Sequence, residues 1–224
     1  SQGYLLQRSG DDHAGRKIYF SYVNLAGIRD RIEIDLNFVH RIGFGSTRKE
    51  PMWQPGEFPR PELTLAGLED ICAGKLCALM SRCRPRDLYD ATRLPKIAIQ
   101  FWHSHQFKRL FVAFSGMLDH PLHAYKRERL NRVDQAQVDM ELVSMLAGRG
   151  PASASELVEQ AWAAVGHLMD LDDAEREFVD RLQLGELRPE LLFPDDALLA
   201  DRVAQFPPLL WKVQNARKHK AAGP

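Results

Sequence analysis

The sequence predicts an α+β fold in which strands near the N-terminus precede a C-terminal helical bundle. Two segments before residue 60 show the period-two alternation of strands. From Thr64 onward apolar residues recur at helical spacing instead. With 224 residues, 45% of them hydrophobic and 27% charged, the chain is long enough to bury a sizeable core. We therefore expect residues 1–60 to be the remaining strands of one domain and residues 61–224 to be a helical bundle.

The predicted strands cover residues 16–24 and 30–38. In the second, apolar and polar residues alternate, so we expect one buried face and one polar face that carries Asp35. The apolar positions are Ile32, Ile34, Leu36 and Phe38. Residues 39–63 are rich in glycine and proline and predict a loop with room for a short strand, including a turn at Gly43–Ser46.

The predicted helices cover residues 66–81, 86–93, 96–116, 133–147, 154–169, 173–184, 195–205 and 208–218. Ser153 with Glu156, and Asp172 with Glu175, have the spacing of capping boxes. Several helices are amphipathic, which favours packing into a bundle. Core positions at helical spacing are Phe101, Trp102, Phe107, Phe111 and Phe114. Trp211 is expected to pack as well, with Lys212 facing outward.

Cysteine and histidine usage argues for a reduced, cytoplasmic protein without a zinc clip. Cys72, Cys77 and Cys83 are an odd number on one predicted helix, which indicates reduced core cysteines, and their spacing does not fit a Cys-x-x-Cys site. The histidine pairs His103/His105 and His120/His123 are expected to be surface or capping residues. No segment approaches the roughly 18 apolar residues of a membrane span.

Charge is segregated along a chain whose net charge is zero. Residues 75–132 hold 12 basic and 4 acidic side chains, whereas residues 133–206 hold 5 basic and 16 acidic ones. The basic segment, which includes Arg127 and Arg129, is suited to attract phosphate groups. The alternative is that the two segments neutralise each other within the molecule.

The segment with the most chemical information is residues 67–94, GLEDICAGKLCALMSRCRPRDLYDATRL. In one unbroken helix, Lys75 and Asp87 would lie about 18 Å apart. Pro85 predicts a break, because the residue before proline avoids the helical region. The second helix can then fold back and bring Lys75 close to Asp87 and Asp90. A cation beside paired carboxylates suits phosphate and metal chemistry, although an exposed hairpin with ordinary salt bridges fits the same spacing.

This segment resembles the signature of the AbiEii/AbiGii-type nucleotidyltransferases, the toxin components of bacterial two-gene toxin–antitoxin and phage-defence systems. The similarity rests on Leu68–Ile71, Ala73–Leu76 and Arg86–Asp90, together with Arg82. Two further segments are similar to the family: Arg31–Leu36, a strand that carries a metal-binding carboxylate, and Phe206–Lys212 with Asn215.

The resemblance implies transfer of a nucleoside monophosphate from a nucleoside triphosphate (NTP) to an acceptor such as tRNA, with Mg²⁺ as cofactor and a cognate antitoxin as partner. It implies that Lys75, Arg82 and Arg86 bind the nucleotide and that Asp35 binds the metal. Lys75, Asp87 and Asp90 would be the catalytic residues. Between the two aspartates, Asp87 would be the catalytic carboxylate and Asp90 would support it or orient Lys75.

One departure from the family pattern affects these expectations. Members normally carry a Gly-Ser motif and an acidic pair upstream of the metal-binding strand, and nothing of that kind precedes Arg31. Gly45-Ser46 follows the strand instead. We therefore expect an N-terminally truncated fragment that is inactive by itself. The alternative is a non-catalytic relative that binds RNA or an antitoxin.

Overall fold

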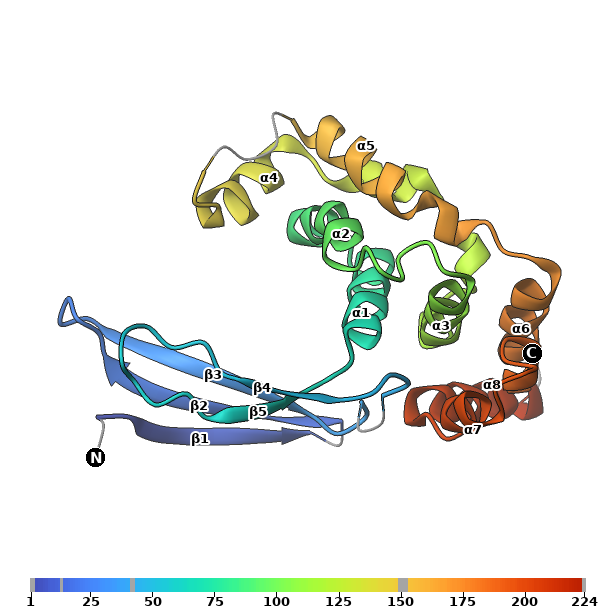
Figure 1. Cartoon of the computed structure of the whole chain (residues 1–224), viewed down its shortest axis with the longest axis horizontal. Helices are drawn as coiled ribbons and strands as arrows, with labels where there is room; N and C mark the ends of the chain where they lie inside the picture. Colours follow the sequence, from blue (N-terminus) through green and yellow to red (C-terminus); the bar gives the residue numbers. More distant parts are fainter. Residues whose placement is uncertain (1–2, 13, 41–42, 149–152, 223–224) are drawn as a thin grey trace. The chain divides into compact units, whose positions relative to one another are not determined.

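Contacts within the computed structural model divide the chain into two units, Ser1–Ile42 and Gly43–Pro224. The structure describes residues 3–12, 14–40, 43–148 and 153–222. The first unit is a small antiparallel sheet and the second is mostly helical (Figure 1), which confirms the predicted α+β class. The predicted domain boundary at residue 60, between the strands and the helical bundle, stays a prediction.

The first unit is a three-stranded sheet in the order β1-β2-β3, with both pairs antiparallel. The strands are β1 Leu5–Asp12, β2 Gly15–Val23 and β3 Arg29–Asn37. The turn between β2 and β3 is closed by the Asn24 side chain, whose Oδ1 accepts the Ala26 and Ile28 N–H groups at 3.0 Å. Gly27 supplies the positive φ of +74° that this turn needs. Strands β2 and β3 confirm the prediction, whereas β1 was not predicted because its sequence lacks alternation.

The apolar face of β3 is more exposed than its alternation predicts. Ile34 lies opposite Ile18 and Ile32 lies opposite Phe20, so apolar side chains do share one face of the sheet. Ile32 and Ile34 nevertheless remain 40% exposed, and the prediction of a buried face is wrong for the described residues. Cross-strand neighbours shield only the flanks of these side chains, and a buried face also needs a packed layer above it.

The second unit begins with an anchored loop and a short hairpin. Phe44 is buried between the rings of Phe114 and Phe206, each with its centroid 4.7 Å away. The Asp70 carboxylate accepts the N–H groups of Phe44 and Gly45 at 3.1 Å. As predicted, Gly43–Ser46 is neither strand nor helix. Strands β4 Arg48–Pro51 and β5 Glu62–Leu65 then pair antiparallel, so the predicted loop contains two short strands.

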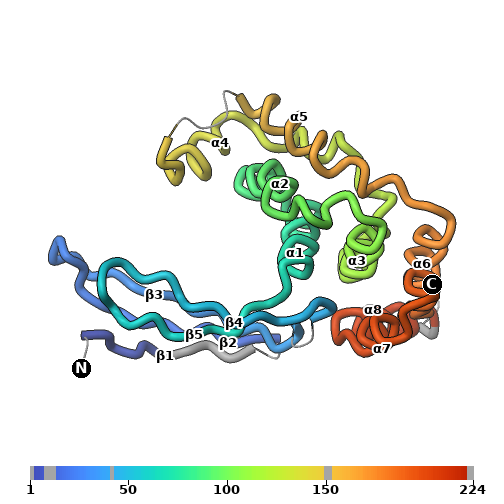
Figure 2. Tube along the Cα trace, in the orientation of Figure 1, coloured from blue at the N-terminus to red at the C-terminus, as the bar shows by residue number. Residues whose placement is uncertain are grey.

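The rest of the second unit is helical, as Figure 2 traces along the chain. The α-helices are α1 Leu68–Ser81, α2 Pro85–Ile97, α3 His105–Ser115, α4 Gln135–Glu141, α5 Ala154–Val165, α6 Asp173–Gln183, α7 Ala197–Ala204 and α8 Pro207–Ala222. Short 3₁₀ turns lie at Leu122–Ala124, Arg127–Arg132, Val143–Met145, Gly166–Met169 and Pro189–Leu191.

The predicted helix over residues 96–116 is wrong, because two helices share this segment. Helix α2 continues through Pro95 to Ile97, and α3 starts only at His105. Ser104 caps α3, since its side chain accepts the Phe107 N–H at 3.1 Å. Trp102 in the connection is buried and donates its indole N–H to the Ala164 carbonyl at 3.2 Å.

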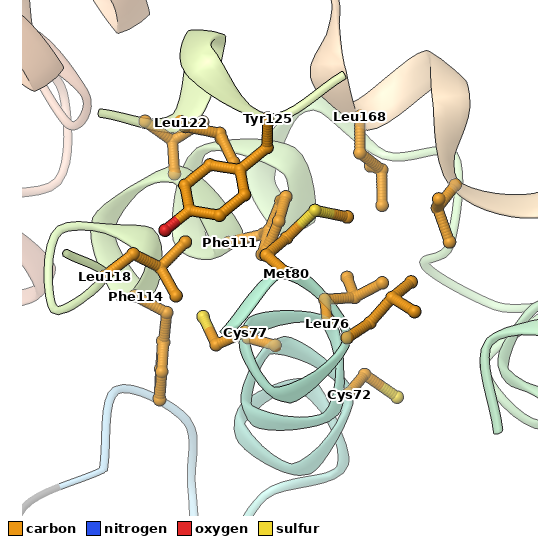
Figure 3. Packing of buried hydrophobic residues seen from close by; sticks show 14 of the residues in the cluster. Cys72, Leu76, Cys77, Met80, Phe111, Phe114, Leu118, Leu122, Tyr125 and Leu168 are labelled. Atoms are coloured by element: carbon orange, nitrogen blue, oxygen red, sulfur yellow. The ribbon is translucent and has the colours of Figure 1, made fainter. Parts of the chain in front are cut away.

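The core of the second unit includes residues from every one of its α-helices, and Figure 3 shows the part between α1, α3 and the turns that follow α3. Cys72 and Cys77 point from α1 into it, alongside Leu76 and Met80. All three cysteines are free and buried, as predicted. Burial raises the pKa of the Cys72 thiol to about 11, so it stays protonated and behaves as a small apolar side chain.

Helix α8 buries a different face from the one expected. Phe206, Leu209 and Val213 are buried, whereas Trp211 is 64% exposed. Lys212 turns inward, and its ammonium group donates to the carbonyls of Leu118 and Asp119 at 2.7 and 3.2 Å. The predicted orientations of Trp211 and Lys212 are therefore wrong. Among the described residues, no helix is both long and apolar enough to cross a membrane.

Candidate functional site

A tight reversal joins α1 to α2 and creates the site geometry. Helix α1 ends at Ser81, and Cys83 takes a left-handed conformation with φ 51°. Pro85 then occupies the first turn of α2, where its missing N–H has no cost. Arg129 holds the end of α1 from outside, because its guanidinium donates to the carbonyls of Met80 and Ser81 at 2.7 and 2.6 Å. The predicted break at Pro85 is confirmed.

Two ion pairs connect the two helices of this hairpin. Lys75 on α1 pairs with Asp90 on α2 at 2.7 Å. Arg82, two turns after Lys75, pairs with Asp87, one turn before Asp90, also at 2.7 Å. Because the earlier residue of α1 meets the later residue of α2, the helices run antiparallel. The predicted convergence of Lys75 with at least one carboxylate is confirmed, and its partner is Asp90.

In the Arg82–Asp87 pair the carboxylate is buried. The Asp87 side chain is fully buried, while that of Arg82 is 48% exposed. The two Asp87 oxygens accept from Arg82 Nε at 3.1 and 2.9 Å and from the Arg84 backbone N–H at 3.0 Å. These hydrogen bonds to Asp87 raise the pKa of the Arg82 guanidinium, and the nearby charge of Asp90 adds to the effect. Asp87 therefore fixes both the start of α2 and the orientation of Arg82.

The Lys75–Asp90 pair is accessible to solvent. The Lys75 side chain is 46% exposed and that of Asp90 is 34% exposed. An ammonium group has three donors, of which the contact with Asp90 uses one. Exposed ion pairs of this kind stabilise a protein by only about 0–1 kcal/mol. Lys75 or Asp90 can therefore exchange this contact for one with a bound ligand at little cost in free energy.

Gly74, beside Lys75 in the middle of α1, has no packing reason to be glycine. A Cβ built on it would meet nothing within 4 Å. Glycine inside a helix is nevertheless less stable than alanine by about 0.8–1.0 kcal/mol. At 100° per residue, Gly74 and Ala78 fall on the same side of α1 as Lys75 and Arg82. Ile71, which is 40% exposed, falls on this side as well, so the side combines two cations, two small residues and one apolar side chain.

Asp35 lies in the first unit, on strand β3. Its side chain is 64% exposed on the polar face of β3, as predicted. Lys17 lies directly opposite on β2 and contacts both Asp35, at 3.2 Å, and Glu33. The hydrogen bond to Glu33, and to a smaller extent the one to Asp35, raises the pKa of Lys17. Two carboxylates thus converge on one cation.

The basic segment 75–132 is partly neutralised by the acidic segment 133–206. In the described part of the chain, three ion pairs join Lys or Arg of the first segment to Glu of the second. They are Arg84–Glu141 at 3.0 Å, Lys108–Glu175 at 2.7 Å and Arg127–Glu159. A hollow of about 270 Å³ is lined by Lys126, Arg129 and Arg132, with one acid, Glu128, beside them, and its other lining residues are His120, Ala124 and Tyr125. Both interpretations of the charge segregation therefore have support.

A group that was not predicted from the sequence lies where α3 and α6 begin. His105, Asp172 and Glu175 each place one potential ligand atom within 4.8 Å of the others. The Asp172/Glu175 capping box was visible in the sequence and is confirmed. Its association with His105 was not visible, because 67 residues separate His105 from Asp172.

Comparison with models of protein families identifies the family of this chain. A family model described as nucleotidyl transferase AbiEii toxin, type IV TA system, matches residues 4–192. The match covers both the β-sheet unit and the hairpin. Searches of curated proteins and of solved structures found no match.

Proposed function

Because the chain belongs to the AbiEii family of nucleotidyl transferase toxins from type IV toxin–antitoxin systems, we propose that it transfers a nucleoside monophosphate from an NTP to an acceptor such as tRNA. In this reaction an acceptor hydroxyl attacks the α-phosphorus, a new P–O ester bond forms, and the bond to pyrophosphate breaks. The hydroxyl proton passes to a base or to solvent. The family match carries the reaction class, and the Lys75–Asp90 pair is the observation in the structure that best supports a site.

Lys75 is proposed to bind the triphosphate. Its ammonium group is half-exposed and held by Asp90 at 2.7 Å, which orients it and leaves two N–H donors for phosphate oxygens. Positive charge there would offset the charge of the departing pyrophosphate. Asp90 then has the supporting role that the resemblance implied for it.

Arg82 and Arg86 are proposed to extend this phosphate-binding surface. Arg82 uses Nε and Nη2 on Asp87, so Nη1 stays available to a phosphate. Asp87 is buried and already accepts several hydrogen bonds, which favours the positioning of Arg82 over proton transfer as its role. Arg86 is exposed on the neighbouring turn of α2. Asp87 thus acts through Arg82, while Lys75 and Asp90 are closest to the chemistry.

Gly74 supports a ligand close to Lys75. A helix glycine without a packing role is expected where another molecule approaches the backbone closely. The small side chain of Ala78, one turn later, would widen the same approach. This surface is suited to a flat or extended ligand such as a nucleotide.

Mg²⁺ is the proposed cofactor, with Asp35 as one ligand. The donors present fit this ion in kind, since Asp35 and Glu33 offer carboxylate oxygens and already converge on the Lys17 ammonium. When bound, Mg²⁺ would neutralise charge on the phosphates. Without the ion, the Lys17 ammonium group keeps the two carboxylates close together.

RNA and a cognate antitoxin are the proposed macromolecular partners. Arg127 and Arg129 are engaged within the molecule, by Glu159 and by the end of α1. Lys126 and Arg132, in the wall of the basic hollow, are better placed to meet an RNA phosphate. RNA binding at this surface should weaken steeply with salt, because phosphate contacts release counterions.

The test is a transfer assay with the full-length protein, α-labelled NTPs, Mg²⁺ and tRNA. We expect label in the RNA, and we expect Asp35→Asn and Lys75→Ala to abolish it. Asp35→Asn should leave stability within about 0.5 kcal/mol, because the position is exposed. RNA binding without any label transfer would reject the enzyme and support the non-catalytic alternative.

A further inference from the structure

The ligand-type side chains at the start of α3 and α6 form a second candidate site, outside the nucleotide hairpin. His105 is the first residue of α3, while Asp172 and Glu175 form the capping box of α6. We propose that these three residues bind a divalent transition metal ion, with zinc as the representative ion. The site would link two helix starts and does not depend on nucleotidyl transfer.

The capping box occupies only one oxygen of each carboxylate. Asp172 Oδ1 accepts the Glu175 N–H at 2.8 Å, and Glu175 Oε2 accepts the Asp172 N–H at 2.9 Å. Lys108 also pairs with Oε2, at 2.7 Å. The second oxygens, Asp172 Oδ2 and Glu175 Oε1, approach His105 Nε2 to 3.4 and 4.0 Å. The helix cap thus leaves two carboxylate oxygens near one imidazole.

The Glu175 oxygen that approaches His105 points to a ligand. Glu175 is 0% exposed, and its Oε1 is buried without a hydrogen-bond donor among the described residues. A buried carboxylate oxygen without a partner is destabilising, and such atoms in native proteins call for an explanation such as a bound ion. The capping box accounts for Oε2 and leaves Oε1 unexplained.

The donor types and the His105–Asp172 distance fit zinc. Zinc bonds of about 2.0–2.2 Å place neighbouring tetrahedral ligands about 3.4 Å apart. The distance from His105 Nε2 to Asp172 Oδ2 is 3.4 Å, and a small rotation of the exposed His105 would shorten the 4.0 Å distance to Glu175. An imidazole with carboxylates favours zinc over magnesium, which prefers oxygen ligands only. Lys108 pairs with Glu175, and the positive charges of Arg109 and Lys108 also act on Asp172, so the affinity for the ion would come from the three ligand bonds and not from a net negative charge.

The test is titration of the metal-free full chain with Zn²⁺ by calorimetry, and with Co²⁺ by visible absorption. We expect one ion per chain and a higher melting temperature with Zn²⁺. His105→Gln should weaken Zn²⁺ binding at least about tenfold. Asp172→Asn should weaken it similarly, while asparagine preserves the helix cap and therefore the fold.

Matched controls are His103→Gln, an exposed histidine two residues before the site, and Asp173→Asn, an exposed acid in the first turn of α6. Both should bind Zn²⁺ like the wild type. No Zn²⁺ binding by the wild type would overturn the proposal. Unchanged binding in His105→Gln and Asp172→Asn would also overturn it, since the ion would then lie elsewhere, for example at His103 and His167, whose rings lie 4.7 Å apart.

Discussion

Replacing Gly74 by alanine should separate stability from nucleotide binding. The new methyl group would meet nothing within 4 Å inside the protein, so it adds no strain. It also removes the flexibility of a glycine in the middle of α1. We therefore expect the free energy of unfolding to rise by about 0.8–1.0 kcal/mol.

The same methyl group should weaken nucleotide binding. If the triphosphate approaches the α1 backbone beside Lys75, the methyl group enters occupied space, and such overpacking typically costs about 1–3 kcal/mol. This corresponds to an affinity loss of about 5- to 150-fold. The result would be a variant that is more stable and binds nucleotide less tightly.

The measurement pairs urea unfolding, followed by circular dichroism, with calorimetric titration of NTP and Mg²⁺. Gly148→Ala is the matched control, because its Cβ would also meet open space but lies outside the hairpin. That variant should bind NTP like the wild type. Wild-type affinity in Gly74→Ala would refute the argument that a ligand approaches this side of α1. A loss of stability would show that glycine is needed for the fold itself.

Further predictions concern the hairpin and its anchor. Asp87→Ala should lower the free energy of unfolding by about 3 kcal/mol, and Asp90→Ala by less than about 1 kcal/mol, because only Asp87 is buried; equal losses in urea unfolding would contradict this ranking. Burial raises the pKa of Asp70, so the folded state holds its proton more tightly, and the wild type should lose stability relative to Asp70→Asn as pH rises above the ordinary value of 3.8. A flat stability difference across that pH range would refute the shift. Cys83→Gly should be more stable than Cys83→Ala by about 1 kcal/mol, since both lack the thiol and only glycine tolerates φ 51° without strain; equal melting temperatures would argue against that backbone conformation.

The hairpin was largely predictable from the sequence, because local rules determine it. Pro85 fixes the break, and the spacing of Lys75, Asp87 and Asp90 then brings opposite charges together. The sequence does not determine which cation meets which carboxylate. That choice depends on the antiparallel packing of α1 and α2, which pairs Asp87 with Arg82 and buries it.

Features that depend on distant packing were missed or wrong. The alternation in β3 gives the correct strand, but burial of its apolar face depends on a second layer that periodicity cannot report. Trp211 was expected to be buried because it is large and aromatic, yet the register of α8 is set by Phe206, Leu209 and Val213. His105 acquires its carboxylate neighbours from another helix, and spacing along the chain cannot reveal that contact.

The solvent-exposed side of the α1–α2 hairpin, which carries Lys75, is proposed to bind the triphosphate of an NTP. Calorimetric titration of each NTP with Mg²⁺ into the wild type and Lys75→Ala tests it most directly. Lys96→Ala is the control, because Lys96 is an exposed lysine in the last turn of α2. We expect Lys75→Ala to bind NTP at least about tenfold more weakly, as loss of a charged hydrogen bond predicts, and Lys96→Ala to bind it like the wild type. Equal affinities of the wild type and Lys75→Ala, or no NTP binding by the wild type, would contradict the claim.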